Sequence, residues 1–73
     1  MTRSDALAPL NKGEGSFNLT AGVGIRGEIR RGAIRYGVDF YEEKGWLESI
    51  FVFRGPADQL RQFYNALKNY VNS

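Results

Sequence analysis

The residues of this chain that are best suited to chemistry are arginines and aromatic residues on neighbouring predicted strands. Four arginines lie between positions 26 and 35, with Glu28 as the only carboxylate among them. Guanidinium groups bind phosphates and aromatic rings stack on unpaired bases, so this combination favours single-stranded nucleic acid as a ligand. The predicted binding residues are Arg26, Arg30, Arg35, Tyr41, Phe51 and Phe53.

Catalytic groups are scarce. The chain has no histidine and no cysteine, so its serines lack the usual activating base and thiolate metal sites are excluded. The carboxylates that cluster in sequence are Asp39, Glu42, Glu43 and Glu48. Acid–base or cation chemistry with these carboxylates needs a deep cleft, which one small sheet with one helix does not offer. We therefore expect a protein that is not an enzyme and that uses no cofactor and no metal.

A glycine motif, G-x-G-x-x-G, runs from Gly22 to Gly27. In dinucleotide-binding proteins a helix follows this motif, because the phosphate lies on the N-terminal amides of that helix. Here the residues after Gly27 are expected to continue as strand and turn. The motif therefore does not predict a nucleotide loop.

The elements that must position these residues begin with a pattern of alternating apolar residues. Residues 17–29 carry apolar side chains at odd positions, which is typical of a strand. A turn at Arg31-Gly32 then pairs Ile29 with Ile34 and Glu28 with Arg35, and this hairpin puts the three predicted binding arginines on one face.

A second turn at Glu43-Lys44-Gly45, with a positive φ at Gly45, leads into a third strand over residues 46–54. A three-residue loop pairs Val38 with Ile50 and directs Leu47, Phe51 and Phe53 away from the main core. A loop that differs by one residue instead directs Trp46, Ile50 and Val52 outward. In either register the second face of the sheet needs a cover or a partner.

The C-terminal segment predicts an amphipathic helix over residues 56–71, with Pro56 in its first turn. Its apolar stripe consists of Leu60, Phe63, Tyr64, Leu67 and Val71. The predicted fold is therefore α+β, a three-stranded antiparallel meander followed by one helix that packs on one sheet face (βββα). Residues 1–16 are expected to be a flexible arm, and residues 17–73 the single domain.

The composition restricts the function further. The formal charge is +2, and no apolar run approaches the length of a membrane span. We expect a cytoplasmic protein that does not bind membranes and whose partner is nucleic acid or a larger protein. The alternative to nucleic-acid binding is a protein–protein interaction module, such as a small inhibitor of a larger complex (for example a viral anti-defence protein) or a homodimeric accessory subunit.

The order strand-strand-strand-helix over residues 31–71, with a proline-led final helix, resembles the Whirly and positive-cofactor type of single-strand DNA-binding domain. It is equally similar to the three-strand-plus-helix DNA-binding modules of integrase arms. This resemblance implies DNA binding through the sheet. It rests on element order, so it assigns no individual residues.

Overall fold

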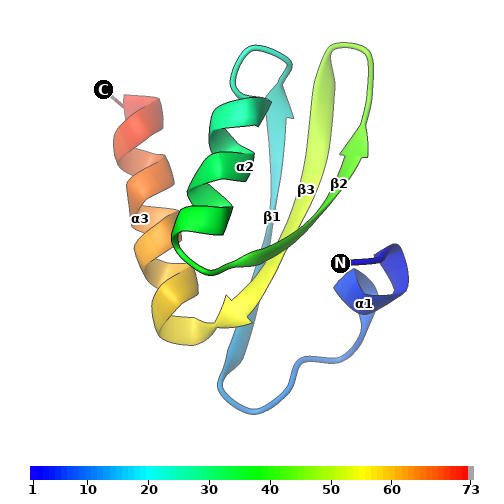
Figure 1. Cartoon of the computed structure of the whole chain (residues 1–73), viewed down its shortest axis with the longest axis vertical. Helices are drawn as coiled ribbons and strands as arrows, with labels where there is room; N and C mark the ends of the chain where they lie inside the picture. The colour runs from blue at the N-terminus through cyan, green and yellow to red at the C-terminus, as the bar shows by residue number, and fades with distance from the viewer. Residues whose placement is uncertain (73) are drawn as a thin grey trace.

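The computed structural model describes residues 1–72, and the side chains of residues 1–70, of an α+β fold (Figure 1). The elements are α1 (Arg3–Leu7), β1 (Glu14–Gly22), α2 (Arg26–Arg35), β2 (Asp39–Lys44), β3 (Glu48–Pro56) and α3 (Ala57–Asn72). The α+β class, the three antiparallel strands and the C-terminal helix on the sheet are confirmed. Val71, the last residue of the predicted stripe, lies outside the residues whose side chains are described.

The sheet order is β1-β3-β2, with both outer strands antiparallel to the central strand β3. The predicted meander order is therefore wrong, and so is the hairpin with a turn at Arg31-Gly32. Residues 26–35 form the helix α2, which connects β1 to β2 across the sheet. The element order on which the resemblance to Whirly and integrase-arm domains rested is not the order of this fold.

Packing explains why this segment is helical. Ile25, Ile29 and Ala33 are spaced four residues apart, so a helix places all three on one face, and Ile29 and Ala33 are fully buried there. Gly32 lies against α3, because a Cβ at this position would be 3.1 Å from a ring carbon of Phe63. A hairpin in place of α2 would lose this contact between residues 26–35 and α3.

The predicted pairing of the second hairpin is also wrong. Phe40 lies opposite Phe53 and Glu42 opposite Phe51, so Phe51 and Phe53 face the core. Ile50 and Val52 consequently face the other side, which is the direction that the second alternative gave them, although the pairing of Glu43 with Ile50 matches neither predicted register. Positive φ angles occur at Gly13 and Gly37 rather than at Gly45.

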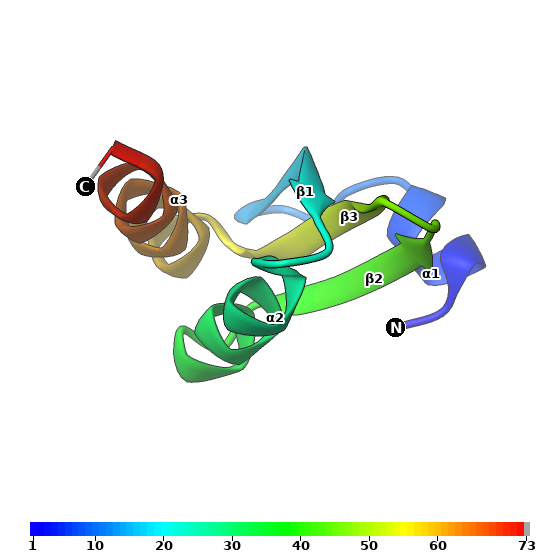
Figure 2. The ribbon, with the colours of Figure 1, turned by 90° about the horizontal axis from the view of Figure 1, so that it is seen from above.

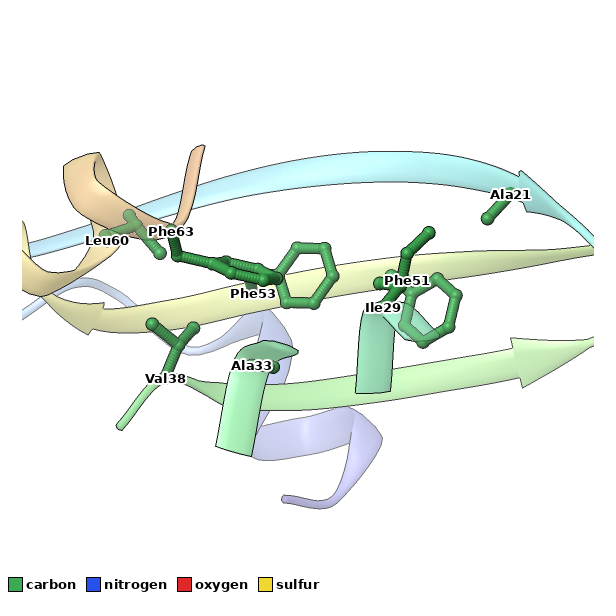
Figure 3. Packing of buried hydrophobic residues seen from close by; sticks show 8 residues of the cluster. All are labelled: Ala21, Ile29, Ala33, Val38, Phe51, Phe53, Leu60 and Phe63. Atoms are coloured by element: carbon green, nitrogen blue, oxygen red, sulfur yellow. The ribbon is translucent and has the colours of Figure 1, made fainter. Parts of the chain in front are cut away.

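The helices α2 and α3 cover one face of the sheet and α1 lies on the other (Figure 2). The core fills the space between the sheet and the two longer helices (Figure 3). In it the ring of Phe53 stacks on Phe51 with centroids 5.4 Å apart and meets Phe63 edge-on at 4.9 Å.

The first sixteen residues hold more structure than the predicted arm. They include α1 and the start of β1, and Ala6 is buried. The buried guanidinium of Arg54 donates to the carbonyl oxygens of Ala8 at 2.9 Å and Pro9 at 3.0 Å, and to that of Asp5. It also donates to a carboxylate oxygen of Glu14 at 2.7 Å. This segment covers part of the sheet face opposite α2 and α3.

Candidate functional site

The hairpin between β2 and β3 ends in two exposed apolar residues. The Gly45 N–H donates to the Glu48 carbonyl at 2.8 Å, so Trp46 and Leu47 alone form the loop. Trp46 is 97% exposed and Leu47 is 81% exposed. Glycine is needed beside them for space rather than for a positive φ, because a Cβ at position 45 would lie 2.7 Å from the Glu48 carbonyl oxygen.

The loop between β1 and α2 lies at the same end of the molecule (Figure 1). A hydrogen bond joins the two loops, from the Val23 N–H to the Leu47 carbonyl at 3.0 Å. Val23 is more than half exposed. We call Val23, Trp46 and Leu47 the loop-end patch.

A polar network behind the hairpin holds this end in place. The Arg26 guanidinium donates to the Gly45 carbonyl at 3.2 Å and to the Ser49 hydroxyl at 3.1 Å. The Ser49 hydroxyl donates to Glu42 Oε2 at 2.6 Å, and Arg30 Nε donates to Glu42 Oε1 at 2.6 Å. The loop-end patch is therefore presented on a hairpin that α2 braces.

The electrostatics of this network follow from its burial. Burial alone raises the pKa of Glu42, whose side chain is only 7% exposed. Hydrogen bonds from Arg30 and Ser49, with the charge of Arg30, outweigh burial and hold the pKa below its ordinary value of 4.5. Glu42 is thus charged at neutral pH, and both of its carboxylate oxygens already accept hydrogen bonds from Arg30 and Ser49. This suits a structural ion pair better than proton transfer.

The three predicted binding arginines do not form one patch. Arg26 and Arg30 turn toward the sheet and are held by the network. Arg35 is exposed and lines a hollow of about 210 Å³ between α2 and α3, together with Arg31 and Tyr36. Because α2 is a helix, its arginines point to two different sides instead of sharing a strand face.

The predicted aromatic residues are also separated. Phe51 and Phe53 are fully buried, so their rings cannot stack on bases as we predicted. Tyr41 is half-buried on the opposite sheet face, across from Val52. The most exposed aromatic residue is instead Trp46, which the second register directed outward but which was not among the predicted binding residues. One signal favoured the observed loop, because a turn at Trp46-Leu47 places Phe40, Phe51 and Phe53 on one face.

The carboxylates that cluster in sequence are divided by the sheet. Glu42 lies on the helix-covered face, whereas Asp39 and Glu43 lie on the other, because strand residues alternate. Among the described residues, no three acidic side chains are placed to hold a metal ion.

The glycine motif has a different context from the one we expected. A helix, α2, begins at Arg26 within the motif, so the prediction of continued strand is wrong. However, the dinucleotide motif belongs to a βαβ unit with parallel strands, and this sheet is antiparallel. Glu28 also places negative charge in the first turn of α2, where a phosphate would lie. The motif still gives no nucleotide site.

Comparisons with protein-family models, curated protein sequences and solved structures find no match to this chain. None of the helices within residues 1–72 has the length and apolar character needed to span a bilayer.

Proposed function

We propose that this chain is a small non-catalytic binding protein whose target is another protein, with the loop-end patch as its anchor. The observation that carries the proposal is the exposure of Trp46 on a two-residue loop that is hydrogen-bonded to its neighbours. Tryptophan is among the residues that dominate interface energies when a partner covers it, and a braced loop loses little entropy on binding.

The surroundings of the patch favour protein over nucleic acid. Charges of both signs flank the loop, with Lys44 between Glu43 and Gly45 and with Glu48 on the other strand. Leu47 and Val23 are aliphatic, so they can fill an apolar pocket but cannot stack on a base. The patch therefore suits an apolar pocket with a polar rim on a larger protein, which fits an inhibitor or an accessory subunit.

The test compares two double variants as baits in a native lysate treated with nuclease. Trp46→Ala with Leu47→Ser should reduce the amount of captured protein at least tenfold, since hot-spot truncation costs about 2 kcal/mol or more. The matched control is Ile34→Ser with Leu10→Ser, because both are exposed aliphatic residues that lie outside the two loops. Equal capture by the parent and the loop variant contradicts the proposal.

A second candidate, single-stranded nucleic acid, is favoured by one feature of α3. The Lys68 ammonium lies 5.8 Å from the centre of the half-exposed Tyr64 ring, and Arg61 lies one turn before Tyr64 on the same helix. None of the ion pairs found among the described residues uses Arg61 or Lys68. A cation beside an exposed ring is the combination that binds phosphate and base together.

A salt titration with labelled single strands tests this candidate. Arg61→Ala with Lys68→Ala should weaken binding to every sequence. The slope of log affinity against log salt should flatten by about 0.7 for each phosphate that the variant no longer neutralises. This pair replaces the predicted arginines as the test, because Arg26 and Arg30 also hold the hairpin. A parent protein that binds no oligonucleotide at low salt excludes nucleic acid.

A further inference from the structure

The outer edge of β1 is the largest unpaired stretch of backbone in this sheet. β1 lies at the end of the order β1-β3-β2 and pairs with β3 along all nine of its residues. On its other side, no part of the described chain pairs with residues 15–21. An open edge of this kind exposes a row of N–H and C=O groups that can pair with another strand.

Proteins commonly protect such edges with charged residues or proline, and the only charged residue in β1 is Glu14 at its very start. No charged residue and no proline occurs from Gly15 to Ile25. The opposite edge strand, β2, is short and carries charges at Asp39, Glu42, Glu43 and Lys44. The two edges thus differ in the feature that normally prevents strand pairing between molecules.

We propose that two copies of this chain pair through β1, antiparallel about a two-fold axis at Asn18. This register uses all nine residues of the strand, because Glu14 of each copy lies opposite Gly22 of the other. It places Phe17 opposite Leu19 on the helix-covered face and Ser16 opposite Thr20 on the other. Every pair between Ser16 and Thr20 then matches apolar with apolar and polar with polar, which is what fixes strand register.

The surface beside this edge supports a second copy as the occupant. A hollow of about 410 Å³ lies between β1 and α3, with Phe17, Leu19, Tyr64 and Leu67 in its lining. Phe17 and Leu19 of the second copy would continue the apolar face of the sheet across the axis and cover this hollow. The result is one six-stranded sheet with two loop-end patches, and it does not depend on what those patches bind.

Single cysteines test the arrangement directly, because the chain contains none. Asn18, Ser16 and Thr20 are all exposed on the open face, so their replacement should leave the fold intact. Directly opposed strand residues have Cα atoms about 4.5–5.5 Å apart, which is within disulfide reach. Asn18→Cys should therefore oxidise to a covalent dimer.

The matched controls use the same strand. Ser16→Cys or Thr20→Cys alone should not cross-link, because each would be about 13 Å from its own copy at ~3.3 Å per residue. An equal mixture of the two variants should cross-link, since Ser16 and Thr20 oppose each other across the axis. Cross-linking of Ser16→Cys alone as fast as Asn18→Cys overturns the proposal.

Charge provides a reversible version of the test. Ser16→Lys with Thr20→Lys places like charges opposite each other and should give a monomer, whereas Ser16→Lys with Thr20→Glu should remain a dimer. Sedimentation equilibrium should find twice the 8.2 kDa chain mass for the parent and for the Lys/Glu variant. A parent that sediments as a monomer up to high concentration, or a Lys/Lys variant that stays dimeric, overturns the proposal.

Discussion

Arg30 of α2 and Glu42 of β2 form an ion pair whose Nε–Oε1 distance is 2.6 Å, and Ser49 of β3 donates to the same carboxylate. One carboxylate thus ties the helix to two strands. Glu42→Ala should lower the free energy of unfolding by about 1–3 kcal/mol, since it leaves Arg30 and Ser49 without their acceptor. Urea unfolding measures this. Glu43→Ala, an exposed neighbour on the other face, is the control, and an equal effect of both changes would contradict this role of Glu42.

The same carboxylate predicts how stability depends on pH. The folded pKa of Glu42 lies below its ordinary 4.5, so its stabilising contribution is present above that value and is lost as pH falls through the folded pKa. The pKa of Glu14 is also lowered, by hydrogen bonds from the Asn11 backbone and Arg54. Protonation of Glu14 should therefore also reduce stability as pH falls. The urea midpoint of the parent should therefore fall between about pH 5 and pH 2. Glu42→Gln should flatten this fall, and an unchanged pH profile in that variant would refute the assignment.

The core around Phe63 predicts a large packing effect. Its ring is fully buried against Phe53 and approaches Gly32 of α2, so it joins α3 to both the sheet and the other helix. Phe63→Ala should cost about 3–5 kcal/mol, the range for emptying a buried aromatic site, and a domain this small has little stability to lose. Tyr64→Ala, at the next and half-exposed position, should cost about 1 kcal/mol. Thermal melts that shift equally for the two variants would show that the ring is not a core residue.

Arg54 predicts the behaviour of the N-terminal segment. Its guanidinium binds three carbonyl groups of residues 5–9, and its Nε is buried without a hydrogen-bond partner. Arg54→Gln should release this segment, so trypsin should cut after Lys12 about tenfold faster, which corresponds to about 1.4 kcal/mol in the opening equilibrium. Cleavage after Arg61, inside α3, reports global unfolding and serves as the internal reference. If the two cleavage rates rise together, Arg54 stabilises the whole fold rather than the arm.

The sequence predicts the fold class and the final helix because their patterns permit one interpretation. The stripe from Leu60 to Leu67 has helical spacing only, and the alternation over residues 17–21 suits only a strand. The segment from Val23 to Tyr36 carries both patterns at once, since Ile25 and Ile29 fit a period of two and a period of four. Packing against Phe63 decides between them, and that packing joins residues far apart in the chain.

The candidate site was harder to predict for a related reason. The prediction that Phe51 and Phe53 point outward depended on the length of one loop, and a single residue of register reverses every side chain of a strand. The exposure of Trp46 was one of two alternatives, because only the second register directed it outward and the sequence did not decide between the registers. The ion pair between Arg30 and Glu42 could not be predicted, because it requires the helix α2 beside β2 and the predicted meander had no helix in this segment.

The central strand of this sheet is the last of the three to be synthesised. β1 pairs residues 14–22 with residues 48–56, so it has no neighbour until β3 has been made, whereas β2 and β3 close locally. During folding, a strand that carries no charge from Gly15 to Gly22 therefore stays unpaired until β3 is in place. Unpaired strand edges in incompletely folded chains promote aggregation, so the interval before β3 docks is the stage at which β1 is most open to association with another chain.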